Sequence, residues 1–160
     1  MPVFEYRERA YSVTPRPLAE LLACPGPIAN QLGGSAQRKE YSAGEMIFLQ
    51  NSESEGLYLL LAGEFYRSAD RRDKRVALPP LHTGDLAELA AVLGESGHTY
   101  SLMAAVPSAC LLFPRPSLMK AFAEYPPLRM RLLEELGREV SRAYRSVSIP
   151  RRTRARSVIA

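Results

Sequence analysis

The chain has 160 residues, of which 46% are hydrophobic and 24% are charged, a balance typical of one globular domain. This composition excludes a disordered chain, and no apolar run approaches the roughly 20 residues that a membrane-spanning helix needs. The only cysteines, Cys24 and Cys110, are too few for a disulfide framework, and their apolar neighbours predict small core residues. Because the first residues lack the basic-then-apolar order of a signal peptide, we expect a soluble, cytoplasmic protein.

The formal net charge of +4 is concentrated in the last ten residues, which hold four arginines and no acidic residue. The rest of the chain carries 17 of the 21 basic side chains against 17 acidic ones, so no basic folded surface for nucleic acid is indicated. An arginine-rich tail can contact phosphates or acidic lipid, but such tails are more often solvated termini. We therefore expect neither specific DNA binding nor membrane association.

The chain opens with two short helical patches, 18–22 and 28–32, separated by Pro25, Gly26 and Pro27. From residue 39 onwards, short apolar runs bounded by turn residues follow one another closely, which predicts an all-β sandwich or barrel. The expected strands and one hairpin-like charged stretch lie at 46–49, 57–61, 65–66, 68–75, 99–106 and 109–113.

One segment within this β region has a different character. Residues 86–93 are good helix formers, Asp85 can act as the N-cap, and Gly94 can close the end. The sequence therefore predicts one short helix inside the β domain. A second short helix is predicted at 117–122, after the last strand.

The clearest element is a long helix that follows Pro126 and Pro127 and extends from residue 128 to about 147. Apolar residues at alternating spacings of three and four form an a/d seam along it: Leu133, Leu136, Val140, Ala143 and Val147. Leu128 and Leu132 lie to one side of this seam and can face the β domain. The seam is then left for another chain, either a second copy or a different protein, and we expect a homodimer. The alternative is that the whole stripe packs on its own domain.

Four motifs follow one another along the chain: Ala43-Gly44-Glu45-Met46-Ile47-Phe48, Tyr58-Leu59-Leu60-Leu61-Ala62-Gly63, Gly84-Asp85 with Glu88-Leu89-Ala90, and Leu111-Leu112-Phe113-Pro114-Arg115. In their order and spacing, over roughly residues 18–147, the chain resembles the cyclic-nucleotide-binding domain of the catabolite-activator/FNR superfamily. The resemblance implies a mainly β fold with helical ends, a jelly-roll-like β-roll followed by a long C-terminal dimerisation helix. It divides the chain into an N-terminal segment with short helices, the roll, the helix and a basic tail, at 1–38, 39–125, 126–147 and 148–160.

The resemblance also implies a ligand pocket formed by Leu86, Ala87, Glu88, Leu89, Ala90, His98, Thr99, Tyr100 and Ser101. Glu88 aligns with the family glutamate that accepts a ribose hydroxyl; the alternative is an ordinary acidic residue in the first turn of a helix. Ala87 stands where the family has a glycine that lets the backbone approach the ligand. The arginine that clamps the phosphate is absent, since the family's Arg-Ser/Thr-Ala triplet aligns with Thr99-Tyr100-Ser101. His98 is the candidate substitute for this cation.

Without the arginine, we expect binding of cyclic AMP or cyclic GMP to be weak or lost. The two cysteines cannot supply the thiolates of an iron–sulfur cluster, and haem bound by His82 or His98 is a weaker alternative. No Ser/His/Asp or Cys/His arrangement and no group of metal ligands indicates an enzyme.

The expected function is therefore that of a sensor or regulatory domain of a transcription regulator. Only residues 148–160 follow the predicted long helix, too few for a winged helix-turn-helix, so no DNA-reading module of its own is expected. The alternative is an interaction module in which Tyr100 and Leu86 close the pocket and the C-terminal helix binds another protein.

Overall fold

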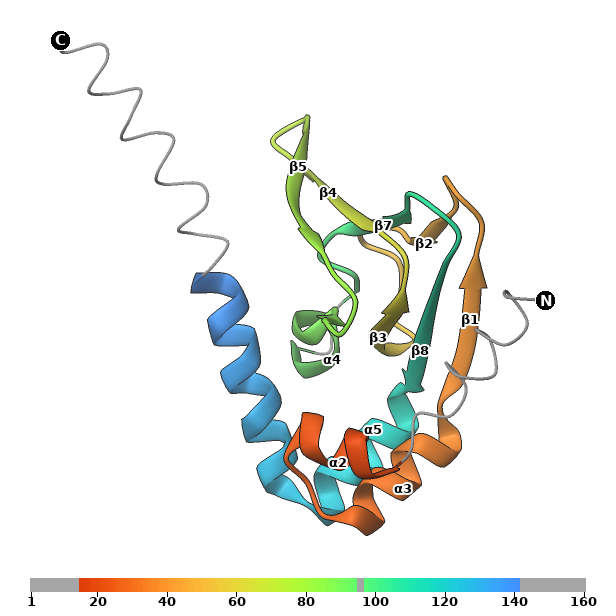
Figure 1. Ribbon diagram of the computed structural model, residues 1–160. Coiled ribbons are helices and arrows are strands. Elements are labelled where there is room, and N and C mark those ends of the chain that lie inside the picture. The colour runs from red at the N-terminus through yellow and green to blue at the C-terminus, as the bar shows by residue number, and fades with distance from the viewer. Residues whose placement is uncertain (1–14, 95–96, 142–160) are drawn as a thin grey trace, which may run out of the picture.

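The computed structural model describes residues 15–94 and 97–141, and eight strands among them form two antiparallel four-stranded sheets (Figure 1). The first sheet has the strand order β1-β8-β3-β6, with bounds Gln37–Tyr41, Ser108–Pro114, Gly56–Ala62 and Leu86–Ala87. The second sheet has the order β2-β7-β4-β5, with bounds Met46–Phe48, Ser101–Ala104, Phe65–Arg71 and Lys74–Leu81. The expected β-roll with helical ends is confirmed.

Helices gather at one end of the roll (Figure 1). Their bounds are Pro15–Leu22 for α2, Gly26–Ser35 for α3 and Arg115–Glu124 for α5, and a further helix covers 126–141. The short helix α4, Leu89–Gly94, lies between β6 and β7. No helix among the described ranges is long and apolar enough to cross a membrane.

Strand β3 separates two cores, because successive side chains of a strand point to opposite faces. Leu57 and Leu59 point into the helical core, which comprises Leu18, Leu22, Ala29, Leu32, Leu57, Leu59, Leu89, Val92, Leu93, Phe113, Leu118, Ala121, Phe122, Leu128 and Leu132. Tyr58 and Leu60 point into the roll core, which comprises Phe48, Tyr58, Leu60, Phe65, Ala69, Leu81, Ala87, Tyr100, Leu102, Cys110 and Leu112. Burial on both faces explains why this strand is a continuous apolar run.

The charged stretch after residue 65 forms the predicted hairpin, β4–β5. Arg72 and Asp73 form its turn with φ values of +51° and +65°, as a tight hairpin turn of the primed type requires. The cysteines also take the predicted core role: Cys110 is buried, Cys24 is half-buried against the helical core, and burial raises the pKa of the Cys110 thiol to about 12.

The predicted helix at 86–93 is wrong over its first three residues. Leu86 and Ala87 form strand β6 against Leu59 and Tyr58, and α4 begins only at Leu89. Sheet pairing overrides the local helix propensity here, because the edge of β3 offers these residues hydrogen bonds and a buried surface. Asp85 does not cap α4; its carboxylate accepts a hydrogen bond from the His82 N–H at 2.8 Å.

The predicted strand at 99–106 is also shorter in the structure, where β7 covers Ser101–Ala104. Thr99 leaves the ladder because both its N–H and its hydroxyl bond to the Glu88 carboxylate. At the other end, the Ala105 N–H donates to the carbonyl of Glu64, in the loop that precedes β4. The two ends of the predicted strand therefore lie in loops and do not pair in the sheet.

The long helix is confirmed over 126–141, and Leu128 and Leu132 face the domain as predicted. The residues of the predicted seam differ in their burial. Leu133 and Leu136 are half-buried and pack against the helical core, whereas Val140 is 60% exposed. The remaining seam positions, Ala143 and Val147, lie outside the described residues.

Candidate ligand site

Glu88 is the buried centre of the predicted pocket, with only 1% of its surface exposed. Its Oε2 accepts hydrogen bonds from the Thr99 N–H at 2.7 Å and from His98 Nδ1 at 2.9 Å, and its Oε1 accepts one from the Thr99 hydroxyl at 2.9 Å. Both carboxylate oxygens are therefore engaged by the loop that precedes β7. We call Glu88, His98, Thr99 and Tyr100 the cassette network.

The backbone of Glu88 makes this arrangement possible. Its φ of +70° lies in the left-handed region, which costs a non-glycine residue about 1–2 kcal/mol. This conformation turns the chain from β6 into α4 and leaves the Glu88 N–H directed at the hydroxyl of Tyr100, at 3.0 Å. The hydrogen bonds of the carboxylate and of the N–H offset the backbone strain.

Tyr100 fills the roll core beneath the network and is 5% exposed. Burial, together with the nearby charge of Glu88, raises the pKa of Tyr100 well above its ordinary value. The Arg67 guanidinium carbon lies 5.0 Å from the centroid of its ring. The side chain that occupies the family's small hydroxyl position is thus part of the core.

His98 is also buried, stacked on Phe48 with ring centroids 3.8 Å apart and an interplanar angle of 8°. Its Nδ1 lies 2.9 Å from Glu88 Oε2, within hydrogen-bond distance. The imidazole is therefore held between an aromatic ring and a carboxylate. Both partners of His98, the predicted substitute for the family's arginine, are therefore groups of the protein itself.

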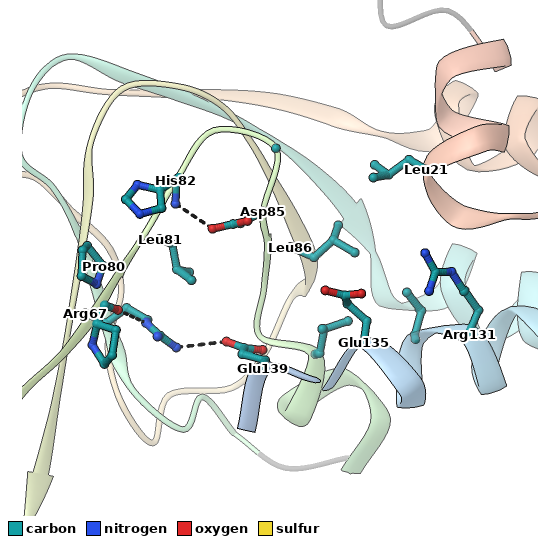
Figure 2. Close-up of a pocket in the computed structure, with 14 residues that line it drawn as sticks. Leu21, Arg67, Pro80, Leu81, His82, Asp85, Leu86, Arg131, Glu135 and Glu139 are labelled. Carbon is teal, nitrogen blue, oxygen red and sulfur yellow. Dashed lines mark hydrogen bonds and ion pairs between the residues drawn. The ribbon is translucent and has the colours of Figure 1, made fainter. Parts of the chain in front are cut away.

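A cavity of about 370 Å³ lies next to the cassette network, between the segment from β5 to β6 and helix 126–141 (Figure 2). We call it the helix cavity. Two of the predicted pocket residues, Leu86 and Leu89, line it, and the other seven do not. Of these seven, Ala87 and Ser101 are buried, Ala90 is half-buried on α4, and the remaining four form the network.

One end of the helix cavity is closed by Arg67, whose side chain is 9% exposed (Figure 2). Its Nε donates to the Pro79 carbonyl at 2.8 Å, and its Nη1 pairs with Glu139 Oε1 at 3.0 Å. Arg67 therefore connects both strands of the hairpin to helix 126–141.

The sequence reasoning missed Arg67, Glu139 and Arg131, all of which line the helix cavity. For Arg67 a signal was present. It alternates with Phe65 and Ala69, both buried, so that a strand period of two places the arginine on the inward face. For Glu139 and Arg131 the sequence offers no comparable signal, since their position depends on how helix 126–141 folds back over the roll.

Residues 38–125 match the family described as the cyclic nucleotide-binding domain. The HTH-type transcriptional regulator Cmr of Mycobacterium tuberculosis is 25% identical over 112 residues, which cover 70% of this chain and 46% of that protein. The chain thus spans about half the length of this curated relative.

Two solved structures share the fold. The catabolite activator protein of Thermus thermophilus has a TM-score of 0.65 at 20% identity, covering 86% of this chain and 60% of that one. The sensor domain of the transcriptional regulator DNR from Pseudomonas aeruginosa has a TM-score of 0.64 at 17% identity, covering 75% and 91%. Together with the β-roll, the match over residues 38–125 identifies the chain as a member of the cyclic nucleotide-binding domain family.

Proposed function

We propose that the chain is a sensory regulatory domain of the catabolite-activator/FNR type that binds cyclic AMP and cyclic GMP weakly or not at all. The observation that carries this proposal is the state of Glu88. The carboxylate that the family resemblance assigns to a ribose hydroxyl is buried and holds three hydrogen bonds to His98 and Thr99. The names of the relatives, a transcriptional regulator and a sensor domain of one, support the regulatory part.

A cyclic nucleotide would have to displace these internal contacts. A ribose hydroxyl reaching Glu88 would leave the Thr99 N–H or the His98 ring without its acceptor, and an unsatisfied buried polar group costs about 1–3 kcal/mol. The phosphate would also lack its arginine, since Thr99, Tyr100 and Ser101 occupy that triplet. The buried guanidinium beside the Tyr100 ring, that of Arg67, already pairs with Glu139.

In this proposal the domain acts as a homodimer, which forms through the C-terminal helix. The exposed side chain of Val140 supports a contact surface beyond the part of the helix that packs on its own domain. Leu133 and Leu136, half-buried against the helical core, would couple that surface to the roll. A different protein as the helix's partner is the second candidate, and self-association distinguishes the two.

A thermal-shift titration with cyclic AMP, cyclic GMP and other nucleotides tests the proposal. A ligand at about 100 times its Kd adds about 2.7 kcal/mol to the stability of the folded state, which is readily detected. We expect no shift with either cyclic nucleotide at concentrations that saturate ordinary members of the family. A saturable shift with one of them would overturn the proposal.

A further inference from the structure

We propose that the helix cavity binds a small amphipathic anion, whose charged group pairs with Arg131 and whose apolar body lies against the leucines of the wall. This inference rests on the proposed function, because it names the chemical class of the effector that such a sensory domain would take. The site differs from the predicted cyclic-nucleotide pocket, since seven of the nine residues of that pocket lie outside it.

The cavity has the size and the walls of a small-molecule site. Its volume of about 370 Å³ lies within the range of about 300–1,000 Å³ that is usual for ligand pockets. Much of the wall is apolar, with Leu86 and Leu89 from the roll side, Leu132 from helix 126–141 and Leu21 from α2. An apolar ligand body would gain free energy by removing this surface from water.

The carboxylates that line the cavity already have partners. Glu139 pairs with Arg67 at 3.0 Å, and Glu135 pairs with Arg138 at 3.3 Å. The Asp85 carboxylate accepts the His82 N–H at 2.8 Å. A cationic ligand would therefore have to compete with contacts that the protein itself supplies.

Arg131 differs from these groups. It is half-buried in the cavity wall, and the described residues give it neither an ion pair nor a hydrogen bond. Figure 2 shows Arg131 at the end of the cavity near Leu21, whereas the Arg67–Glu139 pair lies at the opposite end. The guanidinium without a partner thus stands at the leucine-lined end, where a charge-assisted hydrogen bond to an anion is stronger than in water.

A ligand in this position touches both the roll and helix 126–141. Leu86 and Leu89 belong to the segment that leads into α4, while Arg131 and Leu132 belong to the helix. Because the ligand binds the arrangement in which these surfaces face each other, it stabilises that arrangement relative to any other. The site therefore links occupancy to the position of the helix.

Isothermal titration calorimetry of the full chain tests the proposal with four probes: decanoate, decanol, decyltrimethylammonium and cyclic AMP. The first three share one apolar chain and differ in charge. We expect one-to-one binding of decanoate that is tighter than that of decanol, and no saturable binding of the cation. Arg131→Gln should weaken decanoate binding by roughly tenfold or more, the loss expected for a hydrogen bond between charged groups.

Two further variants separate the site from general surface effects. Arg129→Gln removes an exposed arginine of the same helix that does not line the cavity, and it should leave decanoate binding unchanged. Leu21→Trp, at the rim, should weaken binding by filling part of the cavity.

The inference is overturned if decanoate does not bind, if it binds Arg131→Gln as well as the unmodified chain, or if the cation binds better than the anion. The cyclic AMP probe tests the proposed function and not the further inference. Tight binding of cyclic AMP that survives Arg131→Gln would overturn the proposed function and would leave the result for decanoate to decide the inference.

Discussion

The cassette network and the helix cavity adjoin each other along the chain at Glu88 and Leu89, yet they have opposite character. In the network, the carboxylate, the imidazole, the threonine hydroxyl and the tyrosine hydroxyl all bond to one another or to the backbone. In the cavity, Arg131 is half-buried beside leucines and has no such partner among the described residues. The segment that was predicted to bind a ligand is thus occupied by its own hydrogen bonds, whereas the neighbouring cavity holds a guanidinium that no described residue engages.

The largest effect on stability is expected when the Glu88 carboxylate is removed. Glu88→Ala leaves the His98 ring and the Thr99 N–H without their acceptor, and we expect a loss of about 3–5 kcal/mol in the free energy of unfolding. Urea unfolding measures it. A loss below about 1 kcal/mol would show that the network is not structural.

Glu88→Gly is the matched control for that variant. It removes the same carboxylate but tolerates the φ of +70°, so it should be more stable than Glu88→Ala by about 1 kcal/mol. Equal stabilities would mean that the left-handed backbone at this position is not retained.

The second largest effect is expected from Arg67→Met. This change removes the hydrogen bond to Pro79, the ion pair with Glu139 and the contact with the Tyr100 ring. We expect a loss of about 2 kcal/mol in the free energy of unfolding. Arg71→Met, at an exposed position of the same strand, should change stability by less than about 0.5 kcal/mol.

The helix surface is tested by Val140→Asp. If the seam joins two copies, the aspartate places a charge in an apolar contact, and sedimentation should detect a shift from dimer to monomer. Met130→Asp is the matched control, because Met130 is 58% exposed on the same helix but lies off the seam. Equal masses for the two variants would show that the seam does not form the dimer contact.

The smallest effect concerns the pH dependence of stability. Burial raises the pKa of Tyr100 above its ordinary value of 10, so the folded state keeps the proton while the unfolded state loses it. The free energy of unfolding should therefore fall as the pH rises above about 10. Tyr100→Phe should reduce this slope without abolishing it, since burial also raises the pKa of Tyr41 and Tyr58. An unchanged slope would contradict the burial of the Tyr100 hydroxyl.

The β-roll was predictable from the sequence because its strands are short apolar runs between turns, as Tyr58 and Leu60 on the doubly buried β3 illustrate. Strand β6 was not, because Leu86 and Ala87 favour a helix locally and become a strand only when β3 offers its edge. The order of motifs led to the prediction of Glu88 as a site residue. It did not indicate that this carboxylate bonds inward, which depends on the backbone turn at that residue and on the loop ten residues later.

The pair of Arg67 and Glu139 illustrates a second limit. These residues are 72 positions apart, and no local pattern relates a strand arginine to a glutamate on a later helix. Their contact arises from the tertiary placement of helix 126–141 over the hairpin. The same placement creates the helix cavity, which is why Arg131 could not be selected from the sequence.

The most direct test of the central claim is a titration of ¹⁵N-labelled protein with cyclic AMP, followed through the Thr99 amide resonance. That amide donates to Glu88 Oε2 at 2.7 Å, so it reports whether the carboxylate remains in the cassette network. We predict that the Thr99 resonance does not move at cyclic AMP concentrations that saturate ordinary members of the family. A saturable shift of this resonance would show that Glu88 is released to a ligand and would contradict the account.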